Sequence, residues 1–237
     1  MFIIREILLY ISLGIIIIPG ALVGYYLYKI NAADFTYQIN KEIIIFNDPL
    51  VSSYLIKCDS GYIAIDAGLL VSTTAKALSI NKILPDEVKF VFITHSDIDH
   101  HRAAELFKNA AIYISAPEIE MINNHVPRIS ILPFMKNYFT HHSYKTLNDG
   151  EELLIGKKRI KCILLPGHTE GSMGYLVDGK YLFSGDAFRI KKGKLVPPNI
   201  KLFVMNPDKM NESIENVNEK KGIEYIFTGN SGFIHLR

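Results

Sequence analysis

Side chains of the kind that bind metal ions are concentrated between positions 95 and 100. His95, Asp97, Asp99 and His100 follow an apolar, strand-like run that ends at Ile93. In an extended chain, residues two apart face the same side, so we expect His95, Asp97 and Asp99 to converge. His100, at the start of the next helix, can turn toward them. The segment therefore predicts a site at which ligand-type side chains meet.

The charge of this segment favours a bound cation. Buried carboxylates need a positively charged partner, and no Lys or Arg lies within the run. A divalent ion would supply that charge. The alternative is a polar loop in which Asp99 caps the helix that begins at Arg102.

Two other apolar runs end in residues of the same kind. His168 lies in a tight turn after the run 160–165, and Asp186 follows the run 181–184. Imidazole nitrogen and carboxylate oxygen are ligands that zinc and related divalent ions accept. Together with the first segment, these residues predict a metal centre at the ends of several strands.

The order of strand-like and helix-like segments predicts a mixed α/β sandwich with hairpins. Strand-like runs occupy 43–46, 53–58, 62–66, 90–94, 112–115, 160–165, 173–177, 181–184 and 225–228. Helical patterns begin at Ser72 or Thr73, at Arg102, after Pro117 and at Pro207, the last with Asn206 as its cap and extending to Lys221. No linker or repeat interrupts residues 36–237, so we expect them to form one domain.

Five motifs, in this order, resemble those of the metallo-β-lactamase superfamily. They are Asp66-Ala-Gly, His95-Ser-Asp-Ile-Asp-His, Pro166-Gly-His-Thr, Gly185-Asp and the late Thr228-Gly-Asn. The resemblance covers nearly the whole chain after residue 40. It implies a four-layer αββα sandwich of the metallo-β-lactamase type over residues 36–237, which would bind one or two divalent metal ions.

The resemblance also implies which residues would bind these ions. The expected ligands are His95, Asp97, Asp99, His100, His168, Asp186 and Asn230. His95 and His168 would hold a first ion. Asp99 and His100 would hold a second, and Asp186 would bridge the two.

The sequence departs from the family pattern at two of these positions. Asp97 stands where the second histidine is expected, and Asn230 stands where the last one is. His235 could replace Asn230, although a surface histidine is the simpler interpretation. Each site loses an imidazole and gains an oxygen donor, so manganese or iron is possible besides zinc, the first choice.

The resemblance implies hydrolysis by a metal-activated water. Asp99 would be the catalytic residue that orients the water and passes a proton, while Asp66 and Thr169 would hold the ligand loops. A small ester, thioester or lactone is the expected substrate. The alternatives are a membrane-bound phosphodiesterase or nuclease, and a non-catalytic sensor or binding domain poor in metal.

The N-terminal segment 7–28 contains no charged residue, and 17 of its 22 residues are apolar. At about 1.5 Å per residue, a helix of this length spans a bilayer core. We expect residues 1–30 to form a single transmembrane anchor, with the hydrolase domain on the extracytoplasmic side. A cleaved signal peptide is the alternative.

The overall charge and the cysteines exclude other classes of protein. The net charge is +2 over 237 residues, so no nucleic-acid-binding surface is evident from charge. Cys58 and Cys162 lack the Cys-x-x-Cys spacing of a zinc or redox site, and we expect both to be buried. The sequence does not indicate an oligomeric state.

Overall fold

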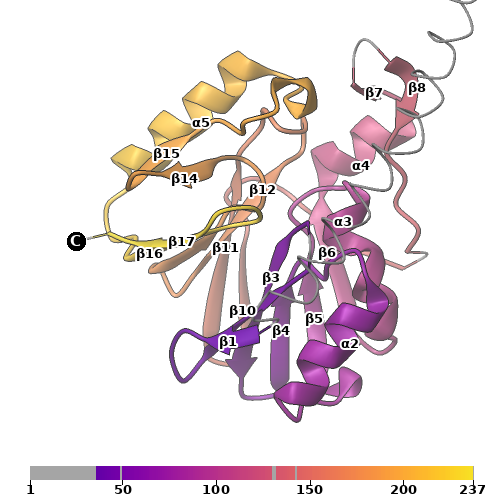
Figure 1. Cartoon of the computed structure of the whole chain (residues 1–237), viewed down its shortest axis with the longest axis vertical. Coiled ribbons are helices and arrows are strands. Elements are labelled where there is room, and N and C mark those ends of the chain that lie inside the picture. The colour runs from indigo at the N-terminus through magenta and orange to yellow at the C-terminus, as the bar shows by residue number, and fades with distance from the viewer. Residues whose placement is uncertain (1–35, 49, 130–131, 142, 237) are drawn as a thin grey trace, which may run out of the picture.

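The computed structural model describes residues 36–48, 50–129, 132–141 and 143–236, with two β-sheets at the centre (Figure 1). The strands of the first sheet are β1 (Thr36–Gln38), β2 (Ile43–Asn47), β3 (Ser52–Cys58), β4 (Gly61–Ile65), β5 (Val88–Phe92), β6 (Ala111–Ser115) and β9 (Lys145–Leu147), in that spatial order. Neighbours are antiparallel from β1 to β4 and parallel from β4 to β9.

The second sheet faces the first. Its strands are β10 (Glu152–Ile155), β11 (Lys158–Leu164), β12 (Met173–Val177), β13 (Tyr181–Phe183), β16 (Tyr225–Thr228) and β17 (Gly232–His235), in that spatial order. Only β13 and β16 are parallel neighbours. The helix α5 (Pro207–Glu219) lies between these two strands in sequence and provides their crossover connection.

Apolar side chains from both sheets fill the space between them. Tyr54 and Ile56 of β3 belong to this layer. The rings of Tyr54 and Phe183 pack edge to face there, with their centroids 5.1 Å apart. Leu55, between them in sequence, is buried on the opposite face of the sheet. Strands buried on both faces appear in sequence as continuous apolar runs, which is why these strands could be predicted.

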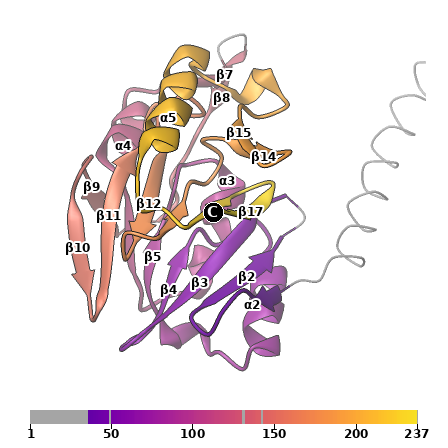
Figure 2. The same cartoon turned by 90° about the vertical axis from the view of Figure 1, so that its left-hand side faces the viewer.

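Helices cover the outer face of each sheet, which confirms the four-layer prediction. The first sheet is covered by α2 (Val71–Ile80), η2 (Arg102–Leu106) and α4 (Ala116–Asn123), through a second apolar cluster. The second sheet is covered by α5 through a third cluster. Figure 1 shows α5 on one side and α2 and α4 on the other, and Figure 2 gives the view at right angles.

The helix α5 follows its sequence pattern closely. The side chain of Asn206 accepts a hydrogen bond from the Lys209 backbone N–H, as a capping residue does. Met210, Ile214 and Val217 are buried against the second sheet. The helix ends at Glu219, two residues earlier than predicted, and Lys220 has extended backbone angles.

Short strands outside the central runs were missing from the sequence prediction. They include the hairpins β7 (Pro127–Ile129) with β8 (Leu132–Lys136) and β14 (Arg189–Lys191) with β15 (Lys194–Val196). Strands of three to five residues at the periphery have too few alternating positions to be distinguished from loops. Strand β7 carries Arg128, whose contacts are described below.

The predicted anchor, residues 1–30, lies outside the described residues. None of the helices that the structure does describe is long and apolar enough to cross a membrane. Of the two cysteines, Cys162 is buried as predicted, and Cys58 is only half-buried.

Candidate metal centre

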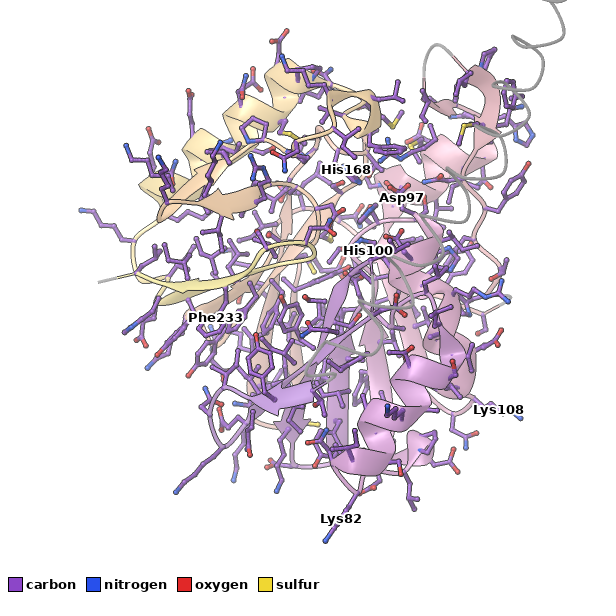
Figure 3. All side chains as sticks on the ribbon, in the orientation of Figure 1. Lys82, Asp97, His100, Lys108, His168 and Phe233 are labelled. Carbon is purple, nitrogen blue, oxygen red and sulfur yellow. The ribbon has the colours of Figure 1, made fainter. Side chains whose placement is uncertain are left out.

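The predicted ligand-bearing loops meet at one edge of the sandwich. His95 follows β5, His168 follows β11, Asp186 follows β13 and Asn230 follows β16, so each loop leaves the carboxyl end of a strand. Figure 3 shows Asp97, His100 and His168 gathered at this edge, between the two halves of the molecule. The fold thus brings together residues from both sheets that are up to 135 positions apart in sequence (95 to 230).

One group of ligand atoms has the character of a metal site. Atoms of His95, His100 and Asp186 lie within 4.8 Å of one another. In the described part of the chain, His95 Nε2, His100 Nε2 and Asp186 Oδ1 are buried and have no hydrogen-bond partner. Buried polar atoms without partners are rare in folded proteins, and a divalent cation would satisfy all three. We call these residues the His95–His100–Asp186 group.

Contacts at the Nδ1 atoms fix the orientation of the His95 and His100 imidazoles. His100 Nδ1 lies 2.7 Å from Asp66 Oδ2, and His95 Nδ1 lies 3.0 Å from Thr94 Oγ1. Asp66 in turn accepts hydrogen bonds from the Thr94 N–H at 2.8 Å and the Thr94 hydroxyl at 2.9 Å. With each Nδ1 engaged, both Nε2 atoms are left without a hydrogen bond, an arrangement common around metal-binding histidines. The predicted supporting role of Asp66 agrees with these contacts.

The charges in this group are strongly coupled. Burial would lower the pKa of His100, but the carboxylates of Asp66 and Asp186 raise it well above its usual value. Burial would raise the pKa of Asp186, but His100, His168 and His95 hold it below its usual value. Without a metal ion, the Asp186 carboxylate favours its negative form and the His100 imidazole its positive form. When His100 loses its proton, the carboxylate charge is no longer balanced, and the group attracts a cation.

Glycines leave room for these side chains. Gly229 and Gly185 lie beside the group, and a Cβ atom at Gly229 would collide with the Asp186 carboxylate. At Gly185, φ is +54°, and a Cβ would meet the side chain of Thr94. Both positions therefore require glycine.

Ligand atoms of His95, Asp97 and His168 also lie within 4.8 Å of one another, and Arg128 lies against the last two of these residues. The Asp97 carboxylate accepts hydrogen bonds from Arg128 Nε at 2.7 Å and from Arg128 Nη2 at 2.8 Å. Arg128 Nη2 also lies 2.9 Å from His168 Nε2, which is 3.0 Å from Asp97 Oδ2. Asn137 donates a further hydrogen bond to Asp97 Oδ1 at 2.7 Å. We call Asp97, Arg128 and His168 the Asp97–Arg128–His168 group.

This geometry corrects the argument that only a metal ion could balance the charge of the loop. The positive partner of Asp97 is Arg128, which is distant in sequence and 5% exposed. Burial would raise the pKa of Asp97, but His168, His95 and Arg128 around its carboxylate hold it well below its usual value. The pKa of His168 is lowered, mainly by burial. No local sequence signal marked Arg128, because its strand is short and peripheral.

Glu118, at the start of α4, connects the loop that carries His95 to the loop that carries His168. Its carboxylate is fully buried and accepts hydrogen bonds from the Ser96 N–H and hydroxyl, the Thr169 hydroxyl and the Gly171 N–H. Ser96 adjoins His95, and Thr169 adjoins His168. Glu118 therefore fixes the relative position of two ligand loops, a role that its place in a helical pattern did not indicate.

Beside these groups lies a cleft of about 520 Å³. Its polar lining comes from Asp97, Asp99, His168, Asp186, Arg189, Asn199, Asn230 and Ser231. Its apolar lining comes from Leu50, Ile98, Phe188, Pro198, Ile200 and Phe203. A pocket with a largely apolar wall and a few converging polar groups is suited to a small molecule.

The structure places Asp99 differently from the extended-chain prediction. The helix α3 (Ile98–His101) begins before Asp99, so the alternation that aligns His95 with Asp97 stops there. Asp99 lies in the cleft wall, outside both groups of clustered ligand atoms. Within the described residues it makes no hydrogen bond or ion pair. Its assignment as a metal ligand stays a prediction.

Asn230 and His235 lie at opposite ends of the β16–β17 hairpin. The amide of Asn230 donates a hydrogen bond to Asp186 Oδ2 at the cleft. His235 pairs with Tyr225 at the far end of the hairpin and stacks on its ring at 4.4 Å. Its predicted surface position is thus what the structure shows, and it does not line the cleft.

A family model described as the metallo-beta-lactamase superfamily matches residues 47–229. The chain belongs to this superfamily. Among solved structures, Rm3 metallo-beta-lactamase superposes with a TM-score of 0.67 at 16% identity, covering 86% of this chain and 80% of that one. A Cronobacter sakazakii metallo-β-lactamase with a HARLDQ motif gives 0.65 at 18%, covering 82% and 77%. At these identities the likeness concerns the fold.

Two curated relatives of this superfamily member are hydrolases. The hydroxyacylglutathione hydrolase of Brucella anthropi is 33% identical over 109 residues, which are 45% of this chain and 36% of that protein. The probable polyketide biosynthesis zinc-dependent hydrolase PksB of Bacillus subtilis is 34% identical over 106 residues, 44% and 40% of the two chains. The chain thus spans less than half the length of these relatives.

Proposed function

We propose that this superfamily member is a metal-dependent hydrolase acting on a small ester, thioester or lactone. The observation that carries the proposal is the set of buried, unpartnered atoms His95 Nε2, His100 Nε2 and Asp186 Oδ1 beside the cleft. Three protein ligands with an open fourth position are typical of catalytic zinc sites. Both relatives are named as hydrolases, which supports the same reaction class, and the name of one includes zinc dependence, which favours zinc.

A divalent ion at this site would lower the pKa of a water and polarise a carbonyl oxygen. The chain's own residues would do the rest. Asp99 lines the cleft with its carboxylate unengaged among the described residues, so it is placed to take a proton from the water and return it to the leaving group. Ile98, Phe188 and Phe203 would bind the apolar part of the substrate.

A metal-poor sensor or binding domain is the second candidate function. The observation that favours it is the Arg128 guanidinium on Asp97, which neutralises a predicted ligand without any metal. For a membrane-bound phosphodiesterase or nuclease, the third possibility weighed from the sequence, we find no supporting contact in the described residues. We also retain the proposal of a single-pass anchor over residues 7–28 with the hydrolase domain extracytoplasmic, since the apolar composition of that segment supports it.

The test is hydrolysis by the full-length chain, purified in detergent and supplied with Zn²⁺, Mn²⁺ or Fe²⁺. The panel contains p-nitrophenyl esters, thioesters, lactones and bis(p-nitrophenyl) phosphate. We expect turnover of an ester, thioester or lactone that is lost on chelation and in Asp186→Ala. Absence of both bound metal and turnover would favour the sensor, and turnover of the phosphodiester alone would favour the third candidate.

The anchor is tested separately by fractionation. Full-length protein should sediment with membranes and resist extraction by high salt, while a chain beginning at Ala32 should not. Recovery of the full-length protein in the supernatant would contradict the anchor.

A further inference from the structure

We infer that Arg128 takes the place of one of the two metal ions, so that the chain binds a single divalent ion at the His95–His100–Asp186 group. This inference rests on the proposed function and specifies its metal site. It also assigns a role to a residue that none of the five motifs contains.

The first step is the saturation of Asp97. Both of its carboxylate oxygens accept hydrogen bonds from Arg128, and Oδ1 accepts another from Asn137. A paired guanidinium in this planar, two-bond geometry forms one of the stronger ion pairs in proteins. Asp97 therefore has its charge balanced and its lone pairs largely engaged before any metal binds.

The second step is the position of the guanidinium at His168. Arg128 Nη2 lies 2.9 Å from His168 Nε2, the same atom that lies 3.0 Å from Asp97 Oδ2. A divalent ion bound by Asp97 and His168 would sit at the cleft wall, next to the permanent positive charge of the buried Arg128 side chain. Like charges at that distance repel, and the repulsion is stronger where the surroundings are partly buried than in open water.

The contrast with the other group is the third step. His95 Nε2, His100 Nε2 and Asp186 Oδ1 make no hydrogen bond among the described residues, and the nearest competing contact is Asp97 Oδ2, 3.4 Å from His95 Nε2. Arg128 is buried and does not line the cleft. It is therefore a positioning residue that holds Asp97 and His168 in place and supplies fixed charge, and it has no direct contact with the cleft's contents.

The experiment counts Zn²⁺ ions bound to the full-length chain by native mass spectrometry and by titration against a chromophoric chelator. We expect one tightly bound ion in the wild type. Arg128→Met, which removes the charge but keeps much of the stem, should bind a second ion at least about tenfold more tightly than the wild type does. Arg159→Met, at a side chain that is 71% exposed, is the matched control and should bind one ion.

Arg128→Gln serves if Arg128→Met fails to fold, because its amide can still donate to Asp97 without a charge; it too should bind two ions. Two equally tight ions in the wild type would overturn the inference, as would a single ion in both folded Arg128 variants. A single ion in the wild type with no hydrolysis would leave the inference intact and contradict the proposed enzyme. Absence of any bound ion would contradict both.

Discussion

The two ligand groups of this site are built alike and differ in how their carboxylate is balanced. Asp186 faces imidazole nitrogens that make no hydrogen bond among the described residues, and Asp97 accepts hydrogen bonds from a guanidinium. Both carboxylates lie on loops that leave strand ends, and both carry a lowered pKa. On the inference drawn above, the same loop architecture attracts a metal ion in one group and excludes it in the other, according to the Arg128 side chain of a peripheral hairpin.

The strongest test of this comparison is to remove the Asp186 carboxylate. Asp186→Ala should weaken Zn²⁺ binding by more than about 100-fold, because even residues that only support ligands are worth about 10- to 100-fold. Asp208→Ala, at an exposed position in the first turn of α5, is the control. The measurement is the Zn²⁺ dissociation constant. An affinity within a few fold of the wild type would show that Asp186 does not bind the ion.

Glu118→Gln tests the support that both groups share. The Gln amide would direct an N–H₂ group at donors that now face a carboxylate, so we expect a loss of about 2–4 kcal/mol in the free energy of unfolding. Glu120→Gln, an exposed position on the same helix, should change it by less than about 0.5 kcal/mol. Urea denaturation monitored by circular dichroism measures both. Equal effects of the two substitutions would contradict the role of Glu118.

Asp66→Asn acts on the His95–His100–Asp186 group alone. Asn tolerates the positive φ of 56° at this position, so the backbone should persist while the charge behind His100 is lost. We expect Zn²⁺ affinity to fall by about 10- to 100-fold. Asp86→Asn, outside the site, provides the comparison for a lost surface carboxylate. Unchanged Zn²⁺ affinity in Asp66→Asn would mean that the charge behind His100 does not tune the site.

The smallest effect is expected from Asn230→His. Asn230 now donates to Asp186, and an imidazole there would offer a nitrogen ligand that zinc prefers to an amide. We expect Zn²⁺ to bind roughly threefold to tenfold more tightly, a change of about 1 kcal/mol. Asn199→His, elsewhere in the cleft lining, is the control. A loss of affinity would indicate that the hydrogen bond to Asp186 matters more than an added ligand.

The positions of the central strands and of α5 could be predicted from sequence because they depend on local patterns. Runs such as 173–177 are buried on both faces, and α5 carries its own cap and apolar stripe. The boundary at Ile98 was predicted wrongly, because α3 is a single turn without a side-chain cap. Such a short helix is determined by its packing, and its local sequence carries little signal.

The sequence by itself determined which residues could bind a metal ion and in which family of folds they lie, because ligand types at strand ends are local and ordered along the chain. The tertiary structure alone decided how those residues are divided. Arg128 reaches Asp97 and His168, and Glu118 joins their loops, only because the fold brings β7 and α4 beneath the site. The charge that balances a carboxylate can come from any part of the chain, so its source is set by distance in space.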